Sequence, residues 1–333
     1  MRVLSSVLVL LAMTPHAVRA DDGAASIAAG GVVLMKRETR IVMAKEVLSI
    51  SPSKVLVEYD FRNDSDEDIT TEVAFPIPDY VDDPDGRESK LAGFDDFKLW
   101  VNGALTKYAV ETRAFTKRGD VTKLLAGYGI DAATFGHEVY DDKAGKAIND
   151  LRRLSAVQKN RLVRMEAIYT SEDLSPIWSV RKKYHWTQTF PAHSVVHIRH
   201  QYTPVLGNSN TIGDPSVYRG KEAVWEYSQC CPAPALRNSL EKIWNKPRGQ
   251  DDVSPLWISY VSFILTTANT WKTPIEDFTL IVERPHDPKY KTYISFCWDG
   301  PVTQVDADHF PAHVTGLVPK KELMIGYIHA ELK

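Results

Sequence analysis

Residues 54–78 read KVLVEYDFRNDSDEDITTEVAFPIP, and this stretch decides the fold because it predicts two strands joined across an acidic turn. The first arm alternates apolar side chains with a mostly charged set, and the apolar side chains are Val55, Val57, Tyr59 and Phe61. Successive side chains of a strand point to opposite faces, so these four line one face that a second layer must cover. The second arm, Ile69–Phe75, ends at Pro76, which has no amide proton for a central strand.

Strand patterns recur along most of the chain. In the N-terminal part we expect them at residues 32–36, 41–50, 94–115 around the Asn102-Gly103 turn, and 178–202. In the C-terminal part they lie at 257–267, 278–283, 293–297, 313–318 and 323–332. Strands this dense with short connections predict a mainly β protein, built as one or two antiparallel β-sandwiches with a C-terminal β layer.

Two segments change to a helical period. Residues 118–173 predict a helical insertion between strands, and residues 235–245 predict an amphipathic helix packed on the C-terminal sheet. The outer face of the insertion is basic through Lys143, Lys146, Arg152, Arg153, Lys159, Arg161 and Arg164. This face is either simply solvated or a contact for anionic lipid or glycan phosphates.

The first 20 residues predict a signal peptide. Arg2 precedes the apolar run Val3–Met13, and Val18-Arg19-Ala20 supplies small residues at a cleavage spacing. The run is shorter than the roughly 20 apolar residues that span a bilayer. We therefore expect a periplasmic or secreted chain, cleaved near Ala20 and not membrane-spanning. Its expected parts are a β-sandwich domain over 21–212 and a second β-rich domain over 213–333, or one continuous sandwich.

Charge and motifs exclude several classes of function. The net charge of −3, with both signs mixed, implies neither nucleic acid nor an acidic surface as partner. The sequence contains no nucleophile elbow, zinc-protease, P-loop or dinucleotide motif, which does not favour an enzyme. No cofactor is indicated, except that an acidic turn offers oxygen ligands for calcium; its residues are Asp79, Asp82, Asp83 and Asp85. The alternative is a solvated acidic turn.

Aromatic and histidine side chains are the main candidates for recognition. Five aromatic residues are candidates for an exposed groove that binds glycan or peptide, or else belong to the core: Trp178, Tyr184, Trp186, Trp257 and Trp271. His200 alternates with Val196, Ile198 and Tyr202, which predicts a core histidine, whereas His197 falls on the opposite, solvent face.

Several segments together resemble a known family. They include AAGGVVLMK, the 54–78 hairpin, YHWTQTFPAHSVVHIRHQYTPVLG, FILTTANTWKTPIEDFTLIVERP and SFCWDG. Across nearly its whole length the chain is similar to the bacterial family named domain of unknown function 4424, whose members are mostly exported and uncharacterised. The resemblance implies a β-rich envelope protein and supplies no catalytic residues. FRNDSDEDITTEVAFPIP alone also resembles the β-sandwich domains of vault and inter-alpha-trypsin-inhibitor proteins, which bears on the fold only.

The resemblance also implies a disulfide. The family has one cysteine before the C-terminal helix and one in the SFC strand, so Cys297 is expected to pair with Cys230 or Cys231. Three functions remain as hypotheses: a binding or assembly module for an envelope protein or glycan, an envelope hydrolase whose acid and base, for example His185, meet only in the fold, and a thiol redox protein at Cys230 and Cys231. The sequence does not indicate an oligomeric state.

Overall fold

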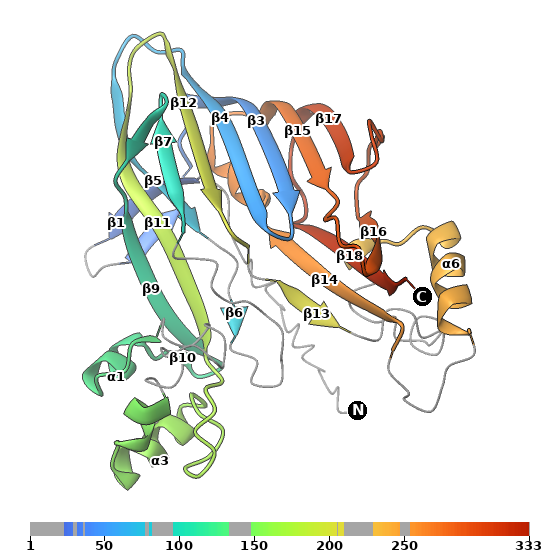
Figure 1. Cartoon of the computed structure of the whole chain (residues 1–333). Coiled ribbons are helices and arrows are strands. Elements are labelled where there is room, and N and C mark those ends of the chain that lie inside the picture. The colour runs from blue at the N-terminus through green and yellow to red at the C-terminus, as the bar shows by residue number, and fades with distance from the viewer. Residues whose placement is uncertain are drawn as a thin grey trace, which may run out of the picture.

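Three β-sheets make up most of the protein. The computed structural model describes residues 23–28, 32–35, 37–76, 80–81, 96–132, 148–204, 206–209, 229–246 and 254–332. Sheet 1 has the order β10-β9-β11-β5-β1-β2 with β6 beside β11, sheet 2 has the order β17-β15-β3-β4-β12-β7-β8, and sheet 3 has the order β13-β14-β18-β16 (Figure 1). The prediction of a mainly β protein with a helical insertion is confirmed.

The strands have the following bounds. Sheet 1 contains β1 (Gly23–Ala28), β2 (Val32–Met35), β5 (Ile69–Pro76), β6 (Tyr80–Val81), β9 (Ala109–Thr116), β10 (Gly119–Asp120) and β11 (Ser179–Phe190). Sheet 2 contains β3 (Ile41–Ser51), β4 (Lys54–Asn63), β7 (Lys98–Val101), β8 (Ala104–Thr106), β12 (Ser194–Tyr202), β15 (Ile275–Glu283) and β17 (His309–Leu317). Sheet 3 contains β13 (Gly207–Ser209), β14 (Leu256–Phe263), β16 (Tyr290–Phe296) and β18 (Leu323–Glu331).

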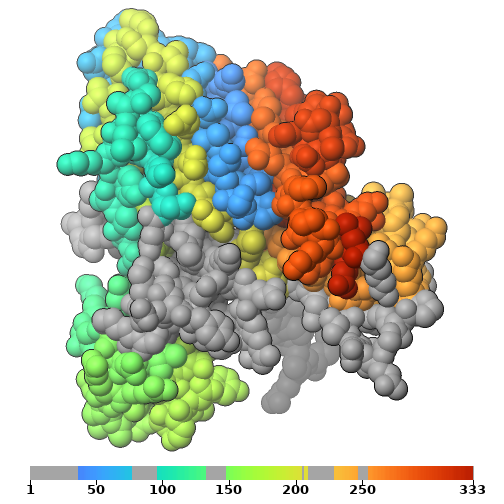
Figure 2. Space-filling view, in the orientation of Figure 1, coloured from blue at the N-terminus to red at the C-terminus, as the bar shows by residue number. Residues whose placement is uncertain are grey.

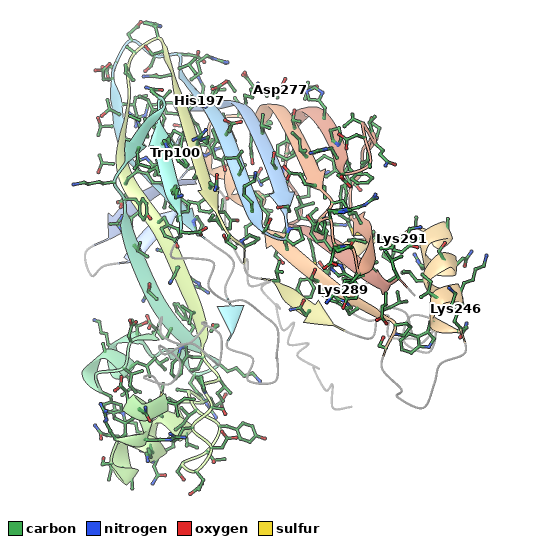
Figure 3. The ribbon with its side chains drawn as sticks, in the orientation of Figure 1. Trp100, His197, Lys246, Asp277, Lys289 and Lys291 are labelled. Atoms are coloured by element: carbon green, nitrogen blue, oxygen red, sulfur yellow. A yellow bond between two sulfur atoms is a disulfide. The ribbon has the colours of Figure 1, made fainter. Side chains whose placement is uncertain are left out.

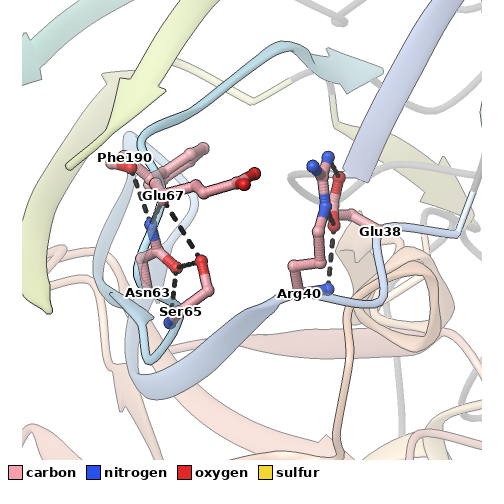
Figure 4. Close-up of polar contacts among 6 residues, drawn as sticks. All are labelled: Glu38, Arg40, Asn63, Ser65, Glu67 and Phe190. Atoms are coloured by element: carbon pink, nitrogen blue, oxygen red, sulfur yellow. Dashed lines mark hydrogen bonds and ion pairs between the residues drawn. The ribbon is translucent and has the colours of Figure 1, made fainter. Parts of the chain in front are cut away.

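The two arms of the 54–78 hairpin enter different sheets. β4 joins sheet 2 and β5 joins sheet 1, and the apolar face predicted for β4 is fully buried. Asn63 fixes the acidic turn between them, since its Nδ2 donates to the carbonyls of Glu67 and Phe190 at 2.8 and 2.9 Å (Figure 4). Its Oδ1 accepts from the amide and hydroxyl of Ser65. The turn is therefore tied to the next hairpin, β11–β12.

Sheets 1 and 2 face each other across an aromatic core. Phe75 of sheet 1 lies 4.2 Å from the ring of His200 in sheet 2, and Phe61 lies 5.8 Å from Phe190. His200 is fully buried, as its place on the apolar face of β12 predicts. Burial lowers the pKa of His200 to about 3, because the core disfavours the charged imidazolium.

Sheet 2 also receives strands from the C-terminal part. β15 pairs in parallel with β3, with Leu280 opposite Leu48, although the strand pattern predicted antiparallel sheets. This pairing places strands from both sides of residue 213 in one sheet. The boundary between the two expected domains stays a prediction.

The labelled α-helices lie at two places (Figure 1). α1 (Thr122–Gly127), a helical turn at 148–152 and α3 (Ala156–Arg164) form the predicted insertion between β9 and β11, and Ser155 begins α3 with a capping box. α6 (Pro234–Trp244) packs Leu240 against sheet 3, as expected, and η3 (Thr266–Thr270) follows β14. No helix in the described ranges is long and apolar enough to cross a membrane.

Sheet 3 lies beside sheet 1 over the same inner face of sheet 2. Tyr327 of β18 donates a hydrogen bond to the Ile50 carbonyl of β3 at 3.1 Å, and Phe263 of β14 contacts Phe75 of β5. The opposite face of sheet 3 packs on α6. One end of the inner face of sheet 3, near Trp257, carries polar and aromatic side chains.

Candidate functional site

A cluster of five side chains occupies that end of sheet 3. Trp257, His329 and Thr292 are direct neighbours across β14, β18 and β16. Ser259 lies on the same face two residues after Trp257, and Tyr290 lies two residues before Thr292. We call these five residues the Trp257–His329 site. They come from three strands that are separated widely in sequence and meet only through the pairing of the sheet.

His329 is held by two hydroxyl groups. Its Nε2 lies 3.0 Å from the Oγ of Ser259, and its Nδ1 lies 3.0 Å from the Oγ1 of Thr292. A neutral imidazole has one donor and one acceptor nitrogen, so one hydroxyl accepts a hydrogen bond and the other donates one. Both ring nitrogens are satisfied in this neutral state, and the ring plane is fixed.

Burial also keeps this imidazole neutral. It lowers the pKa of His329 to about 4, and the nearby Asp287 carboxylate only partly opposes that shift. His329 is 7% exposed, and Ser259 and Thr292 are buried with it. At neutral pH the site is therefore an uncharged polar group set against aromatic rings.

Two aromatic rings complete the site. The indole of Trp257 stacks on the His329 ring, with centroids 3.9 Å apart and an interplanar angle of 20°. Tyr290 stands edge-on to both rings, at 6.0 Å from Trp257 and 6.2 Å from His329. Trp257 and Tyr290 are half-buried, and the exposed Lys289 directly precedes Tyr290 in the chain, whereas Lys291 lies over the Tyr293 ring on the opposite face of sheet 3. The site thus has a fixed aromatic wall at the surface.

The chemistry of the site favours recognition over nucleophilic catalysis. Ser259 and His329 make the contact of a nucleophile with its base, but the second ring nitrogen meets a threonine hydroxyl instead of a carboxylate. An imidazole with a pKa of about 4 is a weak base, and Ser259 is only 2% exposed. These features suit an oriented stacking surface.

The other predicted aromatic residues do not join this site. Trp178, Tyr184, Trp186 and Trp271 are between 1 and 5% exposed and lie in the core of the protein. For these four, the burial agrees with the alternative that they belong to the core. Tyr184 stacks on Phe97 at 4.0 Å between sheets 1 and 2, and Phe61 contacts Trp271 at 4.5 Å. Residue type alone does not show which of these side chains another layer covers.

The acidic turn offered possible calcium ligands, with a solvated turn as the alternative. Asp79, Asp82, Asp83 and Asp85 lie outside the described residues, so calcium at this turn stays a prediction. Within the part of the chain that the structure describes, no group of three or more His, Cys, Asp or Glu side chains is placed to hold a metal ion.

The disulfide joins Cys231 to Cys297, which links the segment before α6 to the end of β16. Cys230 keeps a buried thiol. It packs against β18 at Gly326, where an added Cβ would lie 2.8 Å from the Cys230 sulfur. This close contact shows why β18 has a glycine at that position.

A possible acid and base pair lies on the outward face of sheet 1. Nδ1 of His185 on β11 contacts Oε1 of Glu72 on β5, and both side chains are less than one-fifth exposed. On the same face Lys183 pairs with Glu111 at 2.9 Å. The fold thus brings His185 to a carboxylate, which the hydrolase hypothesis requires.

Sequence reasoning found Trp257 but missed its partners. His329 lies 37 residues from Thr292 and 70 residues from Ser259 along the chain. The available signal was a histidine in the otherwise apolar strand LMIGYIHAE, where a polar group has to find partners.

Comparisons with known proteins place the chain in a family without transferring a ligand to it. No curated protein matches its sequence. A solved structure from Legionella pneumophila, described as a candidate nutrient binding protein, is similar with a TM-score of 0.40 and 12% identity, over 87% of this chain and 68% of that one. The model of the family described as Domain of unknown function (DUF4424) matches residues 20–325. With nearly its whole length matched, the chain belongs to the DUF4424 family.

Proposed function

We propose that the protein is an exported binding protein that recognises an envelope glycan through the Trp257–His329 site. The observation that carries this proposal is the half-buried indole of Trp257, stacked at 3.9 Å on a neutral histidine whose two nitrogens are both hydrogen-bonded. Such an indole is oriented before any ligand arrives, so binding loses little side-chain freedom.

A sugar ring suits this surface chemically. Its face of C–H groups packs on an aromatic ring, while its hydroxyls require polar neighbours. Trp257 and Tyr290 supply aromatic faces at a right angle, with an interplanar angle of 89°. The exposed Lys289 directly precedes Tyr290 in the chain and offers a donor near the site (Figure 3).

Export is supported by the cysteines. The disulfide Cys231–Cys297 is a bond that persists in oxidising compartments and is rare in the cytosol. Together with the expected signal peptide, it favours a periplasmic or secreted location. Binding of an envelope component would take place there.

The test is a titration of the chain from Asp21 onward with soluble oligosaccharides of N-acetylglucosamine, followed by calorimetry. Trp257→Ala should weaken binding about 10- to 100-fold, the effect of losing about 1.4 to 2.8 kcal/mol at a central aromatic contact. Trp298→Ala is the matched control, because Trp298 is also half-buried but stacks on Phe278 of sheet 2.

Two outcomes would overturn the proposal. One is binding that Trp257→Ala and Trp298→Ala weaken equally. The other is no binding of the oligosaccharides, while crosslinking of the tagged protein in the envelope retains a protein and no glycan. The second outcome would support an assembly function instead.

A hydrolase is the second candidate, supported by the His185–Glu72 contact on sheet 1. If it operates, His185→Gln should abolish turnover of the envelope substrate and leave the fold intact. If turnover of envelope extracts is absent in the unmodified protein, the candidate is removed. Thiol redox chemistry at Cys230 and Cys231 stays a prediction, and its test is Cys230→Ser.

A further inference from the structure

The outward face of sheet 2 carries a row of charged side chains. His197, Asp60, Lys45 and Asp277 belong to β12, β4, β3 and β15, and each is a direct cross-strand neighbour of the next. We call these four residues the charged row. Sheets 1 and 3 both cover the inner face of sheet 2, and Figure 2 shows β12, β4, β3 and β15 side by side on the surface of the molecule.

The charged row stays open to solvent. Nδ1 of His197 lies 2.8 Å from Asp60, and Asp277 lies 3.3 Å from Nε2 of His313. These contacts leave the His197 side chain 46% exposed and the Asp277 side chain 47% exposed. Lys45 is exposed at the centre of the row. Figure 3 shows His197 and Asp277 at the same end of sheet 2.

The order of charges makes the row complementary to itself. From β12 to β15 it runs from a histidine through a carboxylate and an ammonium to a carboxylate. When the row is set against its own reverse, the histidine meets a carboxylate and the ammonium meets a carboxylate. A two-fold axis along the strands, midway between β3 and β4, would place Lys45 opposite the partner's Asp60. It would also place His197 opposite the partner's Asp277. Two-fold interfaces use one patch on both subunits in this way.

We propose that the outward face of sheet 2 is the interface of a two-fold symmetric dimer of this chain. The adjacent row supports it. Trp100, Arg199, Glu58, Val47 and Thr279 follow one another across β7, β12, β4, β3 and β15. Arg199 lies over the Trp100 ring at 4.1 Å, a combination common at the centres of protein interfaces. The same axis brings Trp100 opposite the partner's His313.

The flat area of the face approaches that of a stable interface, and side-chain relief adds to it. The strands from β7 to β17 lie about 4.8 Å apart and rise about 3.3 Å per residue, so six strands of about eight residues cover on the order of 600 Å² before side-chain relief is counted. Stable interfaces bury about 800 Å² on each partner. Beside the charged row, the partly buried Val47, Leu56 and Ile281 add apolar area.

Charge reversal tests the proposed register. Asp60→Lys would face the partner's Lys45, and Lys45→Asp would face the partner's Asp60, so each variant alone should sediment as a monomer in analytical ultracentrifugation. An equimolar mixture of the two variants should form a one-to-one dimer, because the reversed charges then attract. Lys123→Asp makes the same charge change on α1 and should leave the dimer intact.

The proposal is overturned if the unmodified chain sediments as a monomer at the highest concentration reached. It is also overturned if the two single variants dimerise as well as the unmodified chain, or if their mixture stays monomeric while circular dichroism shows both folded. Oligosaccharide binding at Trp257 is measured separately on the same variants, so failure of the dimer and failure of the proposed function are distinguishable.

Discussion

Two buried histidines, His200 and His329, occupy different surroundings in the same protein. His200 is enclosed by aromatic rings between sheets 1 and 2, with Tyr59, Phe75 and Phe97 within 5.5 Å. His329 lies on sheet 3, between two hydroxyl groups and under a half-buried tryptophan. Burial lowers the pKa of both, to about 3 and about 4.

The difference separates a histidine that fills the core from one that belongs to the proposed glycan site. His200 contributes ring surface to a core that is closed on all sides, so its replacement should act on stability alone. His329 orients Trp257 next to solvent, so its replacement should act on recognition as well. A lowered pKa alone does not distinguish the two roles, whereas the neighbouring groups do.

Breaking the disulfide should have the largest effect, and should act on the side of sheet 3. Cys231 and Cys297 are 66 residues apart, and closing such a loop stabilises the fold by about 4 kcal/mol in the chain-entropy model. The double variant Cys231→Ser, Cys297→Ser should lower the free energy of unfolding in urea by about that amount. Hydrogen exchange should rise first in α6 and β16. Faster exchange confined to β4 and β12 would contradict the expectation that the disulfide stabilises mainly the region around sheet 3.

Truncating the core histidine should come next. His200→Ala removes a fully buried ring, for which large-to-small changes cost about 2 to 5 kcal/mol. Urea unfolding measures the loss, and oligosaccharide binding should stay unchanged in the folded fraction. His329→Ala is the matched variant, and it should weaken binding as well. If both variants change oligosaccharide binding equally, the proposed difference in role between His200 and His329 is wrong.

Particular residues show how far the sequence predicted these regions. The alternation of Val55, Val57, Tyr59 and Phe61 identified the buried face of β4, and the same rule placed His200 inside and His197 outside. Trp178 and Trp186 were candidates by residue type alone, which does not say whether another layer covers them. The His329 contacts depend on the pairing of β14, β18 and β16, which long-range contacts decide.

Acid should destabilise the fold through both histidines. Both histidines have lowered pKa values, so below pH 6.5 the unfolded chain binds protons that the folded chain does not. The free energy of unfolding is therefore unaffected by these two groups above pH 6.5. It falls as the pH drops toward 4 for His329 and toward 3 for His200. For each histidine, the free energy of unfolding falls by up to about 1.4 kcal/mol per pH unit, which amounts to about 2 kcal/mol near pH 5.

Urea unfolding at about pH 7 and pH 5 measures this loss. His329→Gln removes one of the two titrating groups, so the difference between the two pH values should be smaller by about 2 kcal/mol. If the variant and the unmodified chain lose the same stability on acidification, His329 is not held neutral by the fold.

The smallest expected effect concerns the packing of Cys230. Gly326→Ala would place a Cβ 2.8 Å from the Cys230 sulfur and 2.9 Å from Cδ1 of Ile258. Such overpacking costs about 1 to 3 kcal/mol. Cys230→Ala should restore part of that loss, measured as a coupling energy in a double-mutant cycle. If the effects of the two changes are additive, the contact between residue 326 and Cys230 does not cause the loss of stability.

The most direct test of the proposed glycan site is an NMR titration of the histidine ring resonances, with and without saturating oligosaccharide of N-acetylglucosamine. We predict that His329 titrates near pH 4 in the free protein, and that the sugar shifts its ring signals while those of His200 stay in place. Sugar binding that leaves the His329 signals unchanged would contradict the central claim that Trp257 and His329 form the recognition site.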